Sequence, residues 1–402
     1  MDERLSKLAS KAECDAVMAP IESARTLPAQ AYNDQGWFDL EVERVFKRNW
    51  VAVLFECALP DPGDALPFEF FGMPLLALRG ADGALRVFHN ICPYDGCLAV
   101  RSAATKLREI ETYYHGWRYD LQGRLIDAPY WSGRPTTAPD ALNGHDGNLV
   151  EIRSEVRFGV LFINLDGNAR AIEEWLSPWL KTVGGEYAVN RLVPARDANG
   201  RPLIETRTVD ANWKTYQENA SINILHEAFT HELYRKSPEV PRVDANGVPG
   251  FELFMEGDLV AFGHSRQKSG KTYDPIHLPT AGHDIGQQPD WGYFTTLFPN
   301  LNVPLLDAFI KVNIAIPVSP GVTRLQHLRF YSPEALADPR FQDEEASVQR
   351  LFDVIHLEDR FAIEAVQQAR SSPVWRQHFY APFWDALHHR FNQLVMAAMM
   401  RA

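Results

Sequence analysis

The chain has 402 residues, which corresponds to about two or three domains at roughly 150 residues each. Hydrophobic residues make up 46% and charged residues 23%, as in globular proteins, so a disordered chain is excluded. The net charge of −12 argues against nucleic acid as the main partner. No apolar stretch approaches the about 18 residues of a membrane span, and no signal segment is visible, so we expect a cytoplasmic protein without a membrane partner.

The first part of the chain predicts an arm followed by an all-β domain. Residues 1–36 are mixed in character and predict an N-terminal arm. Residues 37–168 are rich in short apolar runs with strand character. Asp82-Gly83 and Gln122-Gly123 lie between such runs and are typical of hairpin turns. Many short strands joined by tight turns indicate a small β domain.

Residues 169–402 predict a mixture of helices and antiparallel strands. We expect helices over 172–183, from about 213, over 341–369 and near 384–400, with long strands between 291 and 331. Residues 235–290 are rich in Gly, Pro, Asp and His and predict long loops. This part is therefore α+β, with helices on a twisted antiparallel sheet.

Two histidines stand close together after the helix that begins near residue 213. His226 and His231 are five residues apart, so one helix cannot place them on one stripe, and a shared metal requires a break between them. Asn219 and Asn223 would precede His226 at i, i+4 and i+7 along a single polar stripe. A solvated helix face explains that stripe equally well.

A carboxylate on an apolar stripe is the third sign of a metal site. Asp359 follows Ile355 by four residues and precedes Ala362 by three, so it shares their face of the predicted helix. A buried carboxylate needs a cation, strong donors or a raised pKa. Two histidines and one carboxylate form the triad of non-heme iron(II) oxygenases. A salt bridge to Arg360 or to another arginine is the alternative.

Together the motifs resemble the α-subunit of Rieske non-heme iron oxygenases, which include aromatic ring hydroxylases and oxidative demethylases. The resemblance runs from about Trp37 to Met399. Its motifs are NICPYDGCLAV, TYYHGWRYDLQGRL, Asn212-Trp213-Lys214, Glu218-Asn219, His226 with His231, and Glu358-Asp359 with Glu364 and Gln367. It implies an α+β chain in which an all-β Rieske-like domain is inserted before a helix-grip (START-like) catalytic domain, here 37–168 and 169–402.

The resemblance implies a mononuclear Fe(II) held by His226, His231 and Asp359. Asn219 and Asn223 are the further residues that we assign to catalysis. In the family, an Asp at the position of Asn223 connects the cluster of a neighbouring subunit to an iron-binding histidine. The amide of Asn223 keeps the hydrogen-bonding capacity and loses the charge.

The second cofactor of the family, a [2Fe–2S] cluster, lacks half of its ligands here. The family pattern C-x-H, about 17 residues, C-x-x-H leaves Cys92 and His115 as remnant cofactor-binding positions, with Tyr94 and Thr112 replacing the other two ligands. A Rieske cluster needs two thiolates and two imidazoles. We expect no cluster; a rescued cluster or a zinc ion at Cys92, Cys97 and His115 are the alternatives.

The resemblance implies an oxygenase component that uses O2 and depends on a partner for electrons. A reductase or ferredoxin, or an intact α-type subunit in a trimeric or mixed hexameric assembly, would supply them. The 23 Phe and 10 Trp suit an aromatic or apolar substrate, although they also suit any large core. The alternatives are a non-catalytic structural or regulatory α-type subunit and a ligand-binding module that works without iron.

Overall fold

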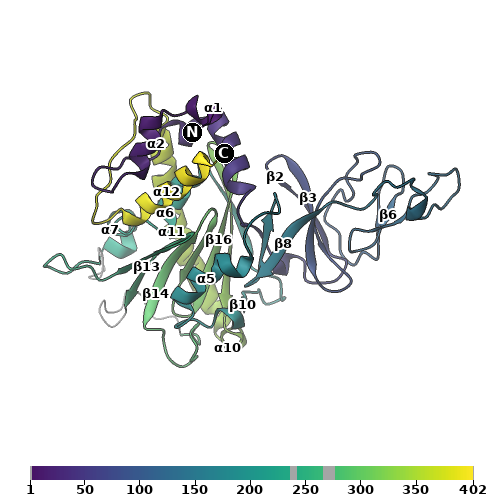
Figure 1. The fold of residues 1–402 in the computed structure, drawn as a ribbon. Coiled ribbons are helices and arrows are strands. Elements are labelled where there is room, and N and C mark those ends of the chain that lie inside the picture. The colour runs from purple at the N-terminus through teal and green to yellow at the C-terminus, as the bar shows by residue number, and fades with distance from the viewer. Residues whose placement is uncertain (1, 236–241, 266–276, 402) are drawn as a thin grey trace. The chain divides into compact units, whose positions relative to one another are not determined.

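The computed structural model describes residues 2–235, 242–265 and 277–401, which form two compact units (Figure 1). The smaller unit spans Ala52–Ala169, and the larger combines Met1–Val51 with Arg170–Ala402. The sequence analysis placed these divisions after residues 36 and 168. The first division differs because the N-terminal helices belong to the larger unit.

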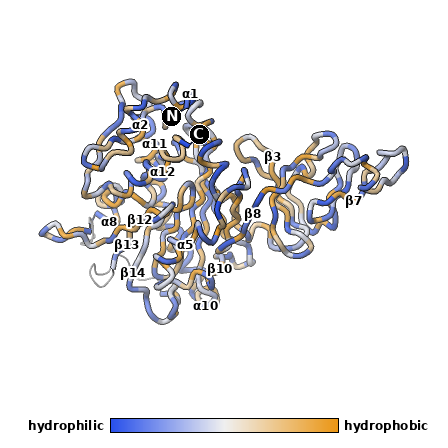
Figure 2. Tube along the Cα trace, viewed as in Figure 1, coloured by the Kyte–Doolittle hydropathy of each residue, from blue (hydrophilic) through white to orange (hydrophobic). Residues whose placement is uncertain are grey.

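The smaller unit is all-β. Its six-stranded sheet has the order β1-β9-β8-β4-β3-β2, and a three-stranded sheet has the order β5-β6-β7. The strands are β1 (Val51–Phe55), β2 (Ala65–Phe70), β3 (Met73–Arg79), β4 (Leu85–His89), β5 (Ile110–Glu111), β6 (Arg118–Tyr119), β7 (Leu125–Asp127), β8 (Glu151–Arg157) and β9 (Val160–Asn164), with short 3-10 turns at Glu56–Ala58 and Pro139–Ala141. Figure 2 shows apolar residues along much of β3.

The two hairpin turns expected from the sequence are present. Gly83 and Gly123 adopt φ values of 77° and 78°, which favour glycine. A Cβ atom on Gly123 would also lie 2.5 Å from the ring of Phe88, so this turn has no room for a side chain. The turns fix the register of the strands that carry the loops described below.

The larger unit contains an eight-stranded antiparallel sheet of order β10-β17-β16-β15-β14-β13-β12, with β11 also paired to β17. The strands are β10 (Val193–Pro194), β11 (Glu205–Val209), β12 (Glu252–Glu256), β13 (Leu259–Ser265), β14 (Trp291–Leu297), β15 (Leu301–Leu305), β16 (Phe309–Ser319) and β17 (Val322–Tyr331). The expectation of long loops over 235–290 is wrong where β12 and β13 form; residues 236–241 and 266–276 lie outside the described residues.

Helices form in the larger unit at all four places where the sequence predicted them, and also at places where it predicted none. They are α1 (Glu3–Ser6), α2 (Lys11–Met18), α3 (Gln30–Asn33), α4 (Gln35–Glu41), a π-turn (Val42–Phe46), α5 (Ile172–Val183), a 3-10 turn (Val189–Arg191), α6 (Trp213–Ala220), α7 (Glu227–Thr230), α8 (Glu232–Arg235), α10 (Pro333–Ala337), α11 (Phe341–Arg370) and α12 (Ala386–Met400). None of the described helices is long and apolar enough to cross a bilayer.

The two faces of the large sheet are covered by different helices. On β14, successive residues point to opposite faces. Thr295 accepts a hydrogen bond from Trp179 of α5 at 3.1 Å, so α5 covers its face. Thr296 points to the opposite face, and strand pairing places Asn302 and Asn313 on that face with it. Lys311, two residues from Asn313 on β16, shares this face, and its ammonium contacts His356 of α11. The face under α11 is the one that matters for the candidate site.

A buried ion pair connects the N-terminal helices to α6. The side chains of Glu41 and Lys214 are both 0% exposed, and Lys214 Nζ lies 2.6 Å from Glu41 Oε1. The Glu41 carboxylate also accepts hydrogen bonds from the indole N–H groups of Trp37 and Trp213, at 2.9 and 2.8 Å. The first turn of α6 is therefore fixed from the far end of the sequence.

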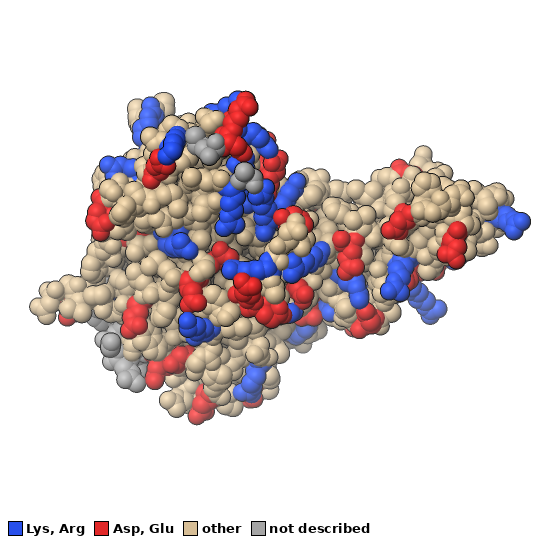
Figure 3. Space-filling model, viewed as in Figure 1, with Lys and Arg blue, Asp and Glu red and all other residues tan. Residues whose placement is uncertain are grey.

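Figure 3 shows acidic and basic side chains interspersed on the visible face of the molecule. On that face, the described Lys and Arg side chains form no continuous basic surface, which agrees with the net charge of −12. This distribution does not favour binding of a nucleic-acid backbone.

Lys214→Met tests the role of the buried ion pair. The substitution should lower the free energy of unfolding by about 3–5 kcal/mol, because it leaves the Glu41 carboxylate buried without a cation. Urea unfolding of the full chain measures the change. Lys181→Met, at an exposed lysine of α5, is the matched control and should change stability by less than about 0.5 kcal/mol. Equal effects of the two variants would contradict the assignment.

Candidate metal centre and cluster remnant

Three elements bring one carboxylate and two imidazoles together. His226 directly precedes α7, His231 lies between α7 and α8, and Asp359 belongs to α11. His231 has extended dihedrals, φ −94° and ψ 120°, so the helix breaks where a shared ion requires it. Oδ1 of Asp359 lies 3.6 Å from Nε2 of His226 and 3.4 Å from Nε2 of His231.

Hydrogen bonds on the far side of each ring fix the tautomers. His226 Nδ1 lies 2.5 Å from the carbonyl oxygen of Asn223, and His231 Nδ1 lies 2.9 Å from Glu358 Oε2. A carbonyl and a carboxylate only accept here, so each Nδ1 carries the proton and each Nε2 keeps a free lone pair. Both lone pairs are thus available at the side of the rings that faces Asp359.

The triad fits a single ion. The donor atoms of His226, His231 and Asp359 all lie within 4.8 Å of one another, which leaves room for an ion about 2 Å from each. Burial raises the pKa of Asp359, but the interactions of its carboxylate, chiefly with His226, outweigh this effect, so the pKa lies below its usual value. Asn219 Nδ2 donates to Asp359 Oδ1 at 2.9 Å. The carboxylate is therefore held ionised and oriented.

Two details of the sequence interpretation are wrong. Asn219 and Asn223 do not share a helical stripe with His226, because α6 ends at Ala220 and Asn223 lies in a turn. The Oδ1 atom of Asn223 accepts the backbone N–H of His226 at 3.2 Å, as short polar side chains do in turns. Arg360 is not the partner of Asp359; it binds Glu364 at 2.7 Å.

In the smaller unit, two loops share one hydrogen-bond pattern. In the first, Cys92 N donates to Cys97 O at 2.8 Å and Gly96 N donates to Cys92 O at 2.9 Å. In the second, Thr112 and Gly116 make the corresponding bonds, at 2.8 Å to Trp117 O and 3.0 Å to Thr112 O. The loop geometry is therefore the same although the residues at matching positions differ.

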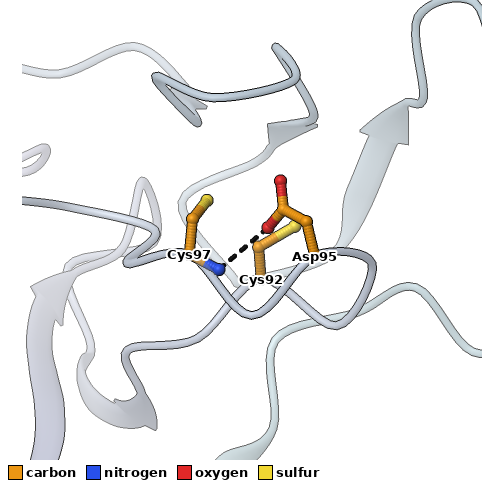
Figure 4. Close-up of side chains that lie close together, drawn as sticks. All are labelled: Cys92, Asp95 and Cys97. Carbon is orange, nitrogen blue, oxygen red and sulfur yellow. Dashed lines mark hydrogen bonds between the residues drawn. The ribbon is translucent and has the colours of Figure 1, made fainter.

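Asp95 belongs to the first of these loops, beside Cys92 and Cys97 (Figure 4). Its carboxylate accepts a hydrogen bond from Cys97 N at 2.9 Å and lies 2.5 Å from His115 Nδ1. The donor atoms of Cys92, Asp95 and Cys97 lie within 4.8 Å of one another. Burial and the Asp95 carboxylate raise the pKa of Cys97 to about 12, which keeps this thiol protonated.

The residues of this remnant do not fit a Rieske cluster. Tyr94 stacks on Trp117 with ring centroids 5.0 Å apart instead of offering an imidazole. The Thr112 hydroxyl is buried and has no hydrogen-bond partner among the described residues. Both available thiols, Cys92 and Cys97, stand on one loop, whereas the cluster requires one cysteine and one histidine from each.

Three residues near these sites escaped the sequence interpretation. Glu358 belongs to the motif, but its contact with His231 depends on the position of α11 relative to α7. Asp95 lies within the motif NICPYDGCLAV, but its contact with His115 was not predicted. Lys311 interrupts the apolar strand AFIKVNIAI, and a charged residue in such a run was a signal that could have been used.

Comparison with known protein families decides the assignment. The model of the ring hydroxylating alpha subunit (catalytic domain) matches residues 187–401, and the model of the Rieske [2Fe-2S] domain matches residues 49–138. The chain belongs to the Rieske oxygenase α-subunit family. Its fold, an all-β Rieske domain before an antiparallel sheet with helices, is the one expected from the sequence.

Several relatives of this Rieske oxygenase α-subunit have named activities. This chain is 26% identical over 358 residues to the carnitine monooxygenase oxygenase subunit of Escherichia coli (strain K12), and the match covers 88% of this chain and 87% of the relative. It is 26% identical over 318 residues to the 2-aminobenzenesulfonate 2,3-dioxygenase subunit alpha of Alcaligenes sp, covering 76% and 74%.

Solved structures show the same fold. A quaternary ammonium Rieske monooxygenase superposes with a TM-score of 0.74 at 19% identity, covering 96% of this chain and 98% of that one. Naphthalene 1,2-dioxygenase from Rhodococcus sp. superposes with a TM-score of 0.73 at 20% identity, covering 99% of both chains. The chain is thus an oxygenase subunit of a family that uses mononuclear iron, O2, and a reductase or ferredoxin, and that forms multimers.

Glu358→Ala tests the hydrogen bond that orients His231. Loss of this contact should weaken Fe(II) binding by about 10–100-fold, because the ring can then rotate and exchange tautomers. Equilibrium dialysis without oxygen measures the affinity. Glu364→Ala, one to two turns further along α11 and bound to Arg360, is the control and should leave the affinity unchanged. Equal affinities in the two variants would show that Glu358 does not support the ligand.

Proposed function

We propose that this chain is a Rieske-type oxygenase component whose own catalytic centre is the mononuclear Fe(II) site at His226, His231 and Asp359. The observation that carries the proposal is the convergence of two Nε2 lone pairs and one ionised carboxylate within 4.8 Å. When bound, ferrous iron supplies the activation of dioxygen for hydroxylation or oxidative demethylation of a small molecule. A protein triad leaves other positions of the ion open for oxygen and substrate.

The surrounding side chains hold the triad in its binding geometry. Glu358 keeps the proton of His231 on Nδ1, and the carbonyl of Asn223 does the same for His226. Asn219 donates to Asp359 Oδ1 and so orients the carboxylate. We assign Asn219 and Asn223 to this positioning, next to the metal ligands.

We further propose that the chain has no [2Fe–2S] cluster of its own and receives electrons from a partner. Tyr94 and Thr112 support this, since neither position offers a cluster ligand. A ferredoxin, or an intact α-type subunit in a trimeric or mixed hexameric assembly, would be the donor. Asn223 lies beside His226, so it stands at the place where a neighbouring subunit would connect to the iron ligands.

His226→Ala tests the site in the assembled enzyme. We expect one iron per chain in the wild type and none in the variant, together with loss of oxygenase activity in the presence of the electron donor. Metal analysis and product formation measure the two effects, and His283→Ala, at an exposed histidine elsewhere in the larger unit, should change neither. Full activity of an assembled His226→Ala complex would overturn the catalytic assignment.

Restoring the missing ligands tests the absence of a cluster. The wild-type chain, reconstituted with iron and sulfide, should contain no acid-labile sulfide and no sulfur-to-iron charge-transfer absorption. Tyr94→His with Thr112→Cys should gain both, because the two loops keep matching hydrogen bonds. Adding Asp95→Arg should strengthen the gain by removing the carboxylate between the loops. Two sulfides per wild-type chain would contradict the proposal.

A second candidate function is a non-catalytic α-type subunit that stabilises an intact one. The observation that favours it is the loss of cluster ligands together with the uncharged Asn223 at the connecting position. It predicts that His226→Ala leaves the activity of the complex unchanged. The preserved tautomer-setting contacts of both histidines favour the catalytic function instead.

The relatives suggest the range of substrates. Those named above act on carnitine and 2-aminobenzenesulfonate, and another, from Methylosulfonomonas methylovora, is a methanesulfonate monooxygenase subunit at 24% identity over 327 residues. All three names describe charged small molecules. A charged small molecule is therefore a candidate substrate beside the aromatic or apolar one expected from the sequence, which the name of another relative, the benzene 1,2-dioxygenase subunit alpha of Pseudomonas putida at 26% identity over 214 residues, represents.

A further inference from the structure

A row of buried polar side chains crosses the large sheet under α11. His327 is paired with Asn313, Asn313 with Asn302, and Asn302 with Thr296. Directly paired residues of antiparallel strands point to the same face, so these four form one row across β17, β16, β15 and β14. All four are buried. His327 stacks on His356 of α11 with ring centroids 4.8 Å apart, so the row lies under that helix.

Lys311 places a buried ammonium beside this row. It precedes Asn313 by two residues on β16, so it shares the face, and it is only 3% exposed. Its Nζ lies 2.6 Å from His356 Nε2 and 4.2 Å from the ring centroid of Phe352. Among the described residues it forms no ion pair with a carboxylate. Burial and the charge of Arg329 lower the pKa of Lys311 to about 7.

The two nearby arginines, unlike Lys311, each form an ion pair with a carboxylate. Arg329 is bound to Glu345 at 2.6 Å, and Arg207 is bound to Glu205 at 2.8 Å. Lys311 is therefore the cation of this group whose charge the described part of the chain leaves uncompensated. An anion beside it would form charge-assisted hydrogen bonds, which are the stronger kind.

Several buried polar atoms of His356 and of the row also have no hydrogen-bond partner in the part of the chain that the structure describes. An ammonium only donates, so His356 Nε2 accepts from Lys311 and the ring proton lies on Nδ1. This Nδ1–H is buried and has no acceptor among the described residues, and His327 Nε2 and Asn302 Oδ1 are likewise unpaired there. Buried polar groups in folded proteins are almost always paired with protein, water or a ligand. These atoms thus require a polar partner.

The polar region lies between two apolar clusters and close to the triad. One cluster contains Phe309, Tyr331, Phe341 and Val348, and the other contains Ala315, Leu325, Tyr216 and Ile363. On α11, His356 precedes Asp359 by three residues, about 4.5 Å along the helix axis. The charge of Asp359 acts on Lys311. A molecule bound here would therefore reach the level of the metal ligands.

We propose that the substrate carries an oxyanion group, a carboxylate or a sulfonate, which binds to Lys311 Nζ and His356 Nδ1–H. The polar row of His327, Asn313, Asn302 and Thr296 binds further polar atoms of the same molecule. This inference rests on the proposed function, because it names the substrate class of that site. A hydrocarbon would leave the ammonium and the imidazole N–H buried without partners. An aromatic acid satisfies both the aromatic content and these polar groups.

The experiment measures binding of small probes to the full, iron(II)-loaded chain without oxygen. Isothermal calorimetry compares benzoate and benzenesulfonate with the uncharged benzyl alcohol. We expect the anionic probes to bind at least about tenfold more tightly, and Lys311→Met to abolish this difference. Lys181→Met, at an exposed lysine, should preserve it. If Lys311→Met does not fold, Lys311→Gln removes the charge with a smaller change of polarity.

A second variant excludes direct binding of the probe to iron. The iron-free His226→Ala chain should still prefer benzoate over benzyl alcohol, since Lys311 and His356 are unchanged. Loss of the preference in this variant would show that the metal binds the oxyanion, and would overturn the inference. Failure of every anionic probe to bind, or benzoate binding by Lys311→Met equal to the wild type, would also overturn it, because the polar row would then hold water only.

The two proposals fail in different ways. If the proposed function is wrong, the chain binds no iron or yields no product, while the preference for anionic probes persists. If the substrate inference is wrong, Lys311→Met keeps its iron and its affinity for benzoate. The iron content of Lys311→Met should equal that of the wild type in either case, because Lys311 is not a ligand.

Discussion

The charge of Asp359 on the inward face of α11 is the constraint around which the larger unit is organised. The half-buried carboxylate needs compensation, which the Asn219 amide provides in part and a cation held with the two imidazoles would complete. Because the helix is interrupted between α7 and α8, His231 and His226 both face Asp359. Helix α6 carries Asn219 near its end, and its start is in turn fixed by the Glu41–Lys214 ion pair. The N-terminal helices thus support the proposed metal centre, although they contribute none of its proposed ligands.

Of the two cofactor sites of the family, this chain keeps the donor atoms of one and lacks half of the ligand residues of the other. At the triad, the donor atoms and the hydrogen bonds behind them are all present. At the remnant, the backbone of the two loops persists, but Asp95 now lies between them and binds His115 and Cys97 N. A negative carboxylate at this point opposes the deprotonation of Cys97 that a rescued cluster on Cys92, Cys97 and His115 would require.

Local patterns sufficed to predict the parts of the structure that are determined locally. The apolar stripe predicted a helix over 341–369, close to α11, and it identified Asp359 as the exception on that stripe. Glycine turns predicted the hairpins. The same reasoning failed for Asn223, because the turn after Ala220 satisfies its side chain locally and ends the helix. It also failed for β12 and β13, which pair with each other as a hairpin, while β13 also pairs with β14 further along the chain.

Long-range register explains why the most informative polar residues were not predicted. Lys311 and His356 are 45 residues apart, and only the packing of α11 on β16 brings them together. Once they are paired, the space between α11 and the sheet contains two groups of opposite charge, the Asp359 carboxylate on α11 and the Lys311 ammonium on β16. A cation at Asp359 would remove the negative field that now stabilises the Lys311 ammonium, and it would add positive charge one helical turn away. Iron binding would therefore lower the pKa of Lys311 further, and an anion beside the ammonium would restore the lost stabilisation.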